Sequence, residues 1–263
     1  MPAPEKPRVR QLSTKAGRAP LVQAYREIES AGWSTWAQAE QRYLRAMYEF
    51  DGLVVSGHAD QGDVQNGKGD FFNDLVSLLL ERCGGKQLDI RGGVPGLSFE
   101  AHNLDAAYPP EGVGPVEITV ETKATGIPKH PRNPRQKHPE GRAGSADLEK
   151  RIKEASLKNI DIKAERARVE GKGGGARQDL GEWMRSAPPK CYMLLAVRVR
   201  DDADLDKTVG FAHIAATWFD RCGLYAYGLN GARDGYEAKR VRDTTLQMDR
   251  VLASICTTLR GLP

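Results

Sequence analysis

The 263-residue chain has few cysteines, few aromatic side chains and no long apolar run. Its four cysteines, Cys83, Cys191, Cys222 and Cys256, form no CxxC pair and no cysteine–histidine spacing suited to zinc. We therefore expect reduced, mostly buried cysteines in a cytoplasmic protein. No stretch approaches the about 20 apolar residues that span a membrane, and the N-terminus lacks the apolar core of a signal peptide. The sequence predicts no membrane partner.

Neither sign of charge dominates. The 39 Lys and Arg residues exceed the 35 Asp and Glu residues by four, a mild basic excess that permits a nucleic-acid partner without requiring one. Hydrophobic residues make up 40% of the chain, which at this length is enough for a full core. The composition fits a single domain, placed at residues 20–263, after an N-terminal arm.

The arm, residues 1–19, is rich in proline and basic side chains and is predicted to be flexible. Two interpretations stay open for it. In the first, the basic residues follow a phosphate backbone and gain affinity from counterion release. In the second, the arm is a leader without a role.

An N-terminal helical lobe is predicted at residues 20–68. A short helix begins near Pro20, and a second has Thr35 as N-cap with Gln38 three residues later, which is a capping box. The composition of residues 52–69, rich in Gly, Asp and Gln, predicts a loop.

A strongly apolar helix follows, with Asp70 as its predicted N-cap and a Gly-Gly pair at its end. One polar stripe runs along this helix and contains Asn73, Asp74, Ser77 and Glu81. Short strands joined by turns are predicted for residues 88–99. The simplest interpretation of the stripe is a solvent-facing surface.

The stretch from residue 104 to residue 123 carries the candidate chemistry. Residues 116–123 alternate apolar and polar side chains, the pattern of a half-buried strand, with Glu121 and Lys123 side by side on its polar face. Residues 104–108 alternate in the same way, and the Pro/Gly-rich turn between the two runs predicts an antiparallel pair. Asp105 then lies next to Glu121.

Two adjacent carboxylates and an ammonium suit a magnesium site. Mg²⁺ takes oxygen ligands, usually one or two carboxylates completed by waters and phosphate oxygens. A metal held there polarises a phosphodiester, and a nearby lysine stabilises developing negative charge. The alternative is that Glu-Thr-Glu-Lys is only the polar face of a solvated strand.

Asp105, followed after a turn by Glu121-Thr122-Lys123, resembles the motif of the PD-(D/E)xK nucleases, the superfamily of most type II restriction endonucleases. The separation, 121 minus 105 or 16 positions, is within the family's usual range, although Leu104 stands where the family often has proline. The resemblance implies that Asp105 and Glu121 bind Mg²⁺, with the Thr122 carbonyl as a further ligand, and that Lys123 is the catalytic lysine.

The resemblance also implies a helix before the first catalytic strand, often with another acidic residue directed at the site. Glu81 and Asp74 are the candidates for this additional acid. A plain solvent-facing stripe is the alternative for both.

The segment after Lys123 is basic and rich in proline, with Glu140 its only acid up to residue 142. It cannot build a core and is predicted to be an exposed loop. Because it leaves the strand that carries the candidate site, we expect it to bind phosphate groups, although a solvated loop is the alternative. The residues expected to contact nucleic acid are Lys129, Arg132, Arg135, Lys137 and Arg142.

The second half of the chain alternates helix and strand. The predicted elements are a mixed-charge helix capped by Ser145, a central strand at 191–199, a helix at 203–222 ended by Gly223, a strand at 224–229 and a helix at 238–259. The predicted fold is therefore α/β, a central mixed β-sheet flanked by helices. Its order agrees with the restriction-endonuclease-like core that the resemblance implies, at residues 69–229, with a C-terminal helix within residues 230–263.

The sequence thus predicts a magnesium-dependent endonuclease that hydrolyses phosphodiester bonds of double-stranded DNA and resembles a site-specific type II restriction enzyme. A palindromic site implies a homodimer, because two-fold DNA symmetry is matched by two-fold protein symmetry. Two alternatives remain. One is a repair, defence or modification-dependent nuclease of the same fold, and the other is a non-catalytic nucleic-acid-binding protein.

Overall fold

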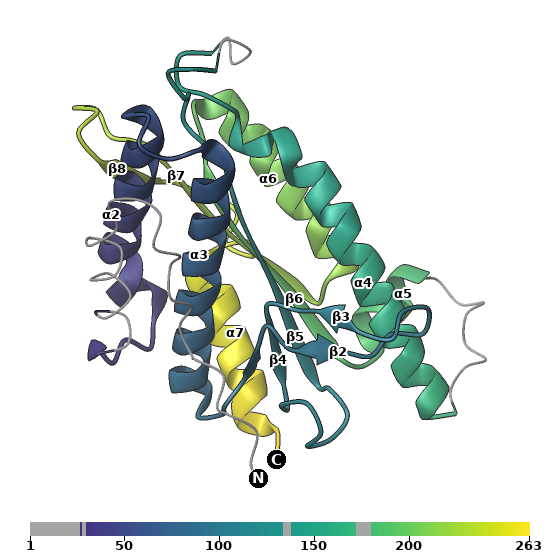
Figure 1. Ribbon diagram of the computed structural model, residues 1–263. Helices are drawn as coiled ribbons and strands as arrows, with labels where there is room; N and C mark the ends of the chain where they lie inside the picture. The colour runs from purple at the N-terminus through teal and green to yellow at the C-terminus, as the bar shows by residue number, and fades with distance from the viewer. Residues whose placement is uncertain (1–26, 28–29, 134–137, 172–179) are drawn as a thin grey trace.

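The computed structural model describes residues 27, 30–133, 138–171 and 180–263. Within these ranges the chain forms a six-stranded sheet, a separate two-stranded pair and helices on both sides of the larger sheet (Figure 1). The predicted arm at 1–19 and the start of the helix expected near Pro20 lie outside the described residues.

The six-stranded sheet has the order β1-β4-β5-β6-β7-β8, and the strands of the small pair are β2 and β3. The strands are β1 (Asp89–Ile90), β2 (Gly93–Val94), β3 (His102–Asn103), β4 (Ala106–Tyr108), β5 (Ile118–Thr125), β6 (Lys190–Arg198), β7 (Arg221–Leu229) and β8 (Tyr236–Lys239). The β5–β6 and β6–β7 pairs are parallel, and the β1–β4, β4–β5 and β7–β8 pairs are antiparallel. The predicted mixed sheet is confirmed.

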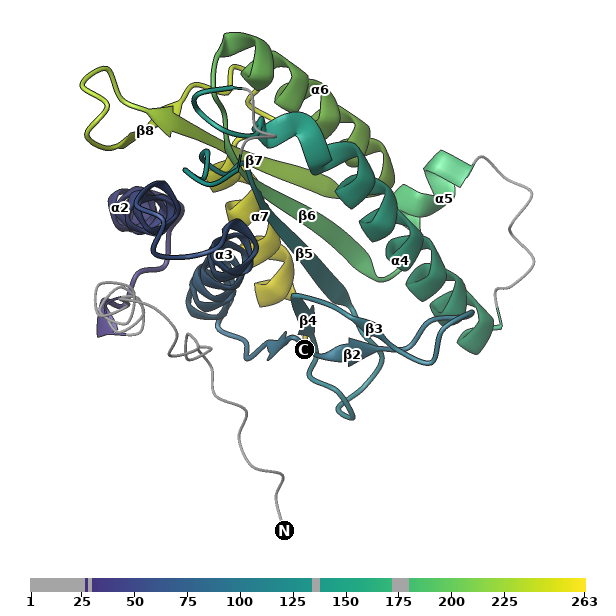
Figure 2. The same cartoon turned by 45° about the horizontal axis from the view of Figure 1, so that its top comes forward.

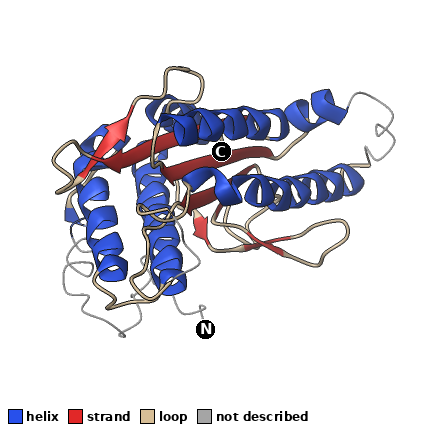
Figure 3. Cartoon of the chain, turned by 90° about the horizontal axis from the view of Figure 1, so that it is seen from above, coloured by secondary structure: helices blue, strands red, loops and turns tan. Residues whose placement is uncertain are grey.

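Helices cover both faces of this sheet. They are α2 (Trp36–Val55), α3 (Gln61–Gly84), the 3-10 helix η1 (Gly144–Asp147), α4 (Leu148–Val169), α5 (Leu180–Ser186), α6 (Asp202–Trp218) and α7 (Met248–Gly261). One core cluster joins α2, α3 and α7 to one face, and a second joins α4 and α6 to the other. Figure 2 shows these layers on opposite sides of the strands, and Figure 3 shows the strands in the middle of the molecule.

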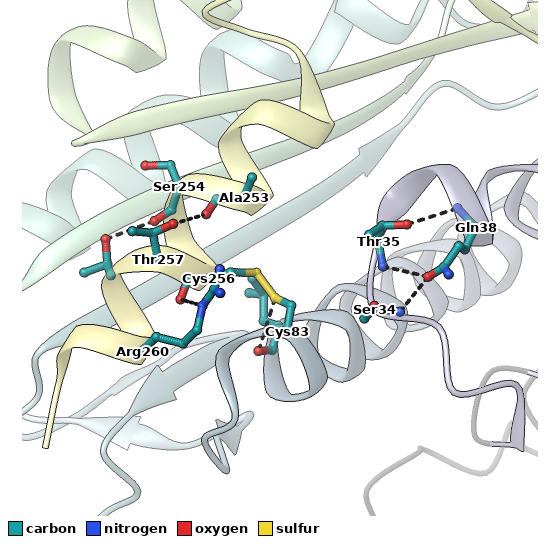
Figure 4. The surroundings of a disulfide bond; sticks show 11 residues. Ser34, Thr35, Gln38, Cys83, Ala253, Ser254, Cys256, Thr257 and Arg260 are labelled. Carbon is teal, nitrogen blue, oxygen red and sulfur yellow. Dashed lines mark hydrogen bonds between the residues drawn. A yellow bond between two sulfur atoms is a disulfide. The ribbon is translucent and has the colours of Figure 1, made fainter.

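The helix predicted after Thr35 is confirmed. Thr35 Oγ1 accepts a hydrogen bond from the Gln38 backbone N–H, and Gln38 Oε1 accepts from the Thr35 N–H, which closes the capping box (Figure 4). The helix continues to Val55, several residues past the predicted loop start at residue 52.

The loop predicted at residues 52–69 is wrong for most of its length, because α3 begins at Gln61 and runs through to Gly84. Glycine weakens an isolated helix by about 1 kcal/mol relative to alanine, which is why the composition suggested a loop. Packing overrides that preference. A Cβ at Gly67 would meet Phe50 at 2.8 Å, and buried Lys68 forms an ion pair of 3.0 Å with Asp51. Asp70 is therefore inside the helix and is not its N-cap.

β5 is buried on both faces, so the prediction of a half-buried strand is also wrong. Ile118 and Val120 belong to the core cluster on the α3 side. Thr119 and Glu121, on the α4 side, are only 4% and 3% exposed. The period-two pattern in this strand separates an apolar interior face from a polar interior face. A charged side chain on the polar face needs partners within the protein.

Three predicted boundaries in the second half are corrected. Ser145 lies inside η1, and Asp147 is the N-cap of α4. Helix α6 ends at Trp218, and Gly223 lies in β7, where a Cβ would meet Leu194 at 2.7 Å. Residues 236–239, near the start of the predicted last helix, pair with β7 as an edge strand. The central strand predicted at 191–199 is confirmed as β6, which is buried almost throughout.

Cys83 at the end of α3 and Cys256 on α7 form a disulfide (Figure 4). The prediction of four reduced cysteines is wrong for these two, because the fold brings their Cα atoms to 5.6 Å, a distance that a disulfide spans. Cys191 and Cys222 are free and buried, and burial raises their pKa values to about 11 and about 12. Among the described helices, none combines the length and apolar character needed to cross a membrane.

Candidate active site

The β4–β5 pairing brings together the three residues that the sequence singled out. Ala106 pairs with Val120, so one step further along the register places Asp105 opposite Glu121. Lys123 follows two residues later on β5 and therefore points to the same face as Glu121. That face of the sheet is the one covered by α4.

Three oxygen atoms converge on the Lys123 ammonium. Its Nζ lies 2.6 Å from Glu121 Oε2, 2.9 Å from the Thr122 carbonyl oxygen and 3.3 Å from Asp105 Oδ2. Each of these contacts has hydrogen-bond or ion-pair geometry. The two carboxylates and the carbonyl expected to bind a metal thus surround one positive charge.

The Asp105 carboxylate is held in place by the backbone and side chain of Thr122. The Thr122 N–H and hydroxyl donate to Asp105 Oδ2 at 2.7 and 3.1 Å. The carbonyl of Asp105 accepts from the Arg91 N–H at 3.1 Å, which ties the residue to the loop after β1. Asp105 therefore presents a fixed carboxylate, with about a quarter of its side chain exposed (28%).

Lys158 on α4 is a fourth charged group at the site, and the sequence reasoning missed it. Its Nζ donates to Glu121 Oε1 at 2.9 Å and to the Asn103 carbonyl at 2.9 Å. Mixed charge of the kind found on α4 more often belongs to a solvated face than to a functional site. A signal was nevertheless available, because Ala155 and Ile162 are buried and Lys158 lies at helical spacing between them.

The site contains two carboxylates and two ammonium groups, and the nearly buried Glu121 carboxylate contacts both lysines. The Glu121 side chain is 4% exposed, whereas those of Lys123 and Lys158 are 22% and 33% exposed. Burial lowers the pKa of Lys123, but the Glu121 and Asp105 carboxylates outweigh burial and hold that pKa above its ordinary value. Lys123 is consequently a cation throughout the neutral pH range.

The donor set fits a hard divalent cation such as Mg²⁺. All three converging atoms are oxygens, and two belong to carboxylates. Among the described residues there is no group of three or more His, Cys, Asp or Glu side chains that could hold a metal. Two carboxylates and a carbonyl leave positions for waters and substrate oxygens, which is how Mg²⁺ is often bound.

The two candidates for an additional acid, Asp74 and Glu81, belong to α3, on the opposite side of the sheet from α4. Asp74 is fully buried and accepts from Arg91 at 2.5 Å. Glu81 Oε1 accepts from the Leu88 N–H at 2.9 Å. The expected solvent-facing stripe is therefore wrong, since Asn73, Asp74 and Ser77 are all buried.

The basic loop leaves the carboxyl end of β5, three residues beyond Lys123. A bridge between Ile127 and Arg142 closes its base. Arg132 is exposed, Lys129 is half-buried, and the exposed Arg142 forms an ion pair of 2.5 Å with Asp147. Arg135 and Lys137 lie outside the described residues.

Comparisons of the chain with protein-family models, with curated protein sequences and with solved structures gave no match. The functional argument therefore depends on the residues and contacts of this chain.

Proposed function

We propose that the protein is a magnesium-dependent endonuclease that hydrolyses phosphodiester bonds of double-stranded DNA. The observation that carries the proposal is the convergence of Asp105 Oδ2, Glu121 Oε2 and the Thr122 carbonyl on one cation, the Lys123 ammonium. A pocket that accommodates an ammonium among three oxygens has the charge and ligand chemistry that Mg²⁺ requires.

Each residue has a definite role in this proposal. Asp105, Glu121 and the Thr122 carbonyl would hold Mg²⁺, which would supply Lewis-acid chemistry for phosphodiester hydrolysis. Lys123 leaves the centre of the three oxygens and, as a cation, donates to the attacking water or to a phosphate oxygen. Its ammonium charge stabilises the negative charge that develops on the phosphate. Lys158 orients Glu121.

Two further features support a nuclease resembling type II restriction enzymes. When the separate β2–β3 pair and the short helices η1 and α5 are set aside, the order α3, β1, β4, β5, α4, β6 is the succession implied by the resemblance to the PD-(D/E)xK nucleases, which supports the proposal. The basic loop leaves the strand that carries the site, which supports a role for its Arg132 and Lys129 in binding the backbone of a duplex. A palindromic target would be cut by a homodimer, one site for each strand.

The test is cleavage of unmethylated phage DNA, and of the same DNA after methylation, by the purified protein with and without Mg²⁺. Two isosteric variants, Asp105→Asn and Glu121→Gln, remove one ligand charge each. Gln41→Ala, at an exposed position on α2, is the matched control.

We expect sharp bands that require Mg²⁺. The bands should persist in Gln41→Ala and disappear in both ligand variants. A smear with the same dependence would keep the nuclease and reject the restriction role. Absence of cleavage on both unmethylated and methylated DNA would reject the nuclease and favour the non-catalytic nucleic-acid-binding protein.

A further inference from the structure

A cavity of about 810 Å³ lies at the carboxyl end of β5. Its wall includes Ala124, Thr125 and Gly126, which directly follow Lys123. A strand advances by about 3.3 Å per residue, so the cavity begins close to the candidate active site. The carboxyl ends of parallel strands are also the usual place for ligands in α/β proteins. The position suits a part of the substrate adjacent to the reacting phosphate.

The charge of the cavity favours an anion. Its described wall contains Arg142, Arg151, Arg200 and His138, with Asp147 as the acidic residue. The ion pair between Asp147 and Arg142, at 2.5 Å, neutralises one of the three arginines. Arg151 and Arg200 form longer ion pairs, of 3.4 Å with Glu154 and 4.0 Å with Asp204, and neither of these acids belongs to the described wall. Guanidinium groups bind phosphate oxygens well.

Arg200 has an unused side-chain donor. Its Nε is buried and donates no hydrogen bond within the described part of the chain. Its ion pair with Asp204 is long, at 4.0 Å. A buried donor without an acceptor is unfavourable, and an anionic oxygen entering the cavity would offer an acceptor to this guanidinium.

The cavity also contains amide groups that are suited to a nucleobase. Gln65 Nε2 donates to the Ala124 carbonyl, which fixes the orientation of the amide and leaves Oε1 as an acceptor. Asn66 is exposed on the next position of α3, and neither atom of its amide has a protein partner among the described residues. Donors and acceptors on amides match the edges of bases, most directly the adenine edge.

We propose that this cavity binds one nucleotide of the DNA strand next to the cleaved phosphodiester. Arg200 and Arg151 bind its phosphate, and the amides of Gln65 and Asn66 contact the edge of its base. This inference rests on the proposed nuclease function and adds to it a residue pair that determines base preference beside the cut.

The first experiment measures binding without metal and without cleavage. Fluorescent tetranucleotides of each base are titrated in EDTA with the wild type, Asn66→Ala and Arg200→Ala. Gln41→Ala on α2 and Arg250→Ala on α7 are matched controls, because both positions are exposed and lie outside the described cavity wall. Arg200→Lys keeps the positive charge, so comparing it with Arg200→Ala shows the effect of losing the charge. Circular dichroism of each variant checks that the fold is retained.

The expected result is that Arg200→Ala weakens binding of every tetranucleotide, and Asn66→Ala removes the preference among bases. Loss of one paired contact to a base corresponds to a change of about 5- to 150-fold in the dissociation constant. Both controls should bind as the wild type does. Unchanged binding in both cavity variants would overturn the inference. Equally tight binding of free deoxynucleoside monophosphates would overturn the inference that the nucleotide belongs to a DNA strand, and would indicate a free nucleotide as the ligand.

The second experiment sequences the ends produced from a randomised DNA library with Mg²⁺. Asn66→Ala should flatten the base composition at one position beside the cut, whereas Gln41→Ala should not. An identical profile in Asn66→Ala would overturn the inference and leave the nuclease intact. Because the binding experiment needs no cleavage, failure of the nuclease proposal and failure of the cavity proposal give different results.

Discussion

Lys158 Nζ on α4 lies 2.9 Å from Glu121 Oε1 on β5 and 2.9 Å from the carbonyl oxygen of Asn103. Asn103 is two residues before Asp105, so one ammonium links the chain segments that supply both carboxylates. The other oxygen of Glu121 contacts Lys123. Lys158 therefore fixes Glu121 from the side opposite the converging oxygens and acts as a positioning residue.

Lys158→Met should lower Mg²⁺-dependent cleavage or the affinity for Mg²⁺ by about 10- to 100-fold, the usual cost of removing a partner of a metal ligand. Lys158→Arg should restore part of the loss, because it keeps a donor for Glu121. Cleavage rates measured across a range of Mg²⁺ concentrations check this. Lys150→Met, on the exposed side of α4, is the control, and an equal effect of both methionine variants would contradict the positioning role.

The raised pKa of Lys123 predicts how its contribution to stability depends on pH. A lysine whose folded-state pKa is above 10.5 stabilises the protein fully below that value, and the contribution is lost as pH rises through the folded-state pKa. Lys123→Met should therefore be less stable than the wild type at neutral pH, by about 1–3 kcal/mol for a hydrogen-bonded charge.

Urea unfolding of both proteins from about pH 8 to about pH 11.5 checks this prediction. The difference in the free energy of unfolding should be constant up to about pH 10 and then shrink. Other titrating groups, such as tyrosines, largely cancel in the difference. A difference that shrinks around neutral pH would mean that the carboxylates do not raise the Lys123 pKa.

Arg132→Ala should weaken binding to duplex DNA and reduce the slope of log K against log salt concentration by about one, as expected for one lost phosphate contact. Arg142→Ala should have a smaller effect, because Asp147 already neutralises Arg142. Fluorescence anisotropy at several salt concentrations measures both slopes. Arg45→Ala, on α2, should leave the slope unchanged, and a slope unchanged in all three variants would place the duplex elsewhere.

Two glycines of α3 provide a matched test of packing against helix propensity. Gly69→Ala should stabilise the protein by about 0.5–1 kcal/mol, since no atom lies within 4 Å of the new Cβ. Gly67→Ala should destabilise it by about 1–3 kcal/mol, because the new Cβ would lie 2.8 Å from the buried Phe50 ring. Urea unfolding measures both changes. Stabilisation by Gly67→Ala would show that Phe50 moves aside easily.

Local spacing was enough to predict the α2 capping box and the pairing of Asp105 with Glu121. In both cases the interacting residues are close in sequence, or are joined by a turn that the sequence marks clearly. Period-two alternation also predicted which side chains of β5 share a face. It gave no information on what covers that face, so the burial of Glu121 by α4 was missed.

The errors concern residues whose state depends on distant parts of the chain. The start of α3 depends on Phe50 filling the space at Gly67 and on Asp51 pairing with Lys68, which outweigh the glycine content. Lys158 reaches the site only because α4 packs across β5. Its helical spacing between Ala155 and Ile162 indicates an inward direction but names no partner, so the sequence alone did not identify it.

The disulfide between Cys83 and Cys256 makes most of the protein a covalent ring. The two cysteines are 173 positions apart, and both carboxylates, Lys123, Lys158 and the basic loop all lie between them. A protease that cuts the backbone once inside this ring opens the ring but releases no fragment, because the disulfide still joins the two pieces. The nicked protein would keep its mass on a denaturing gel until a reductant is added, and it would separate into two pieces only then.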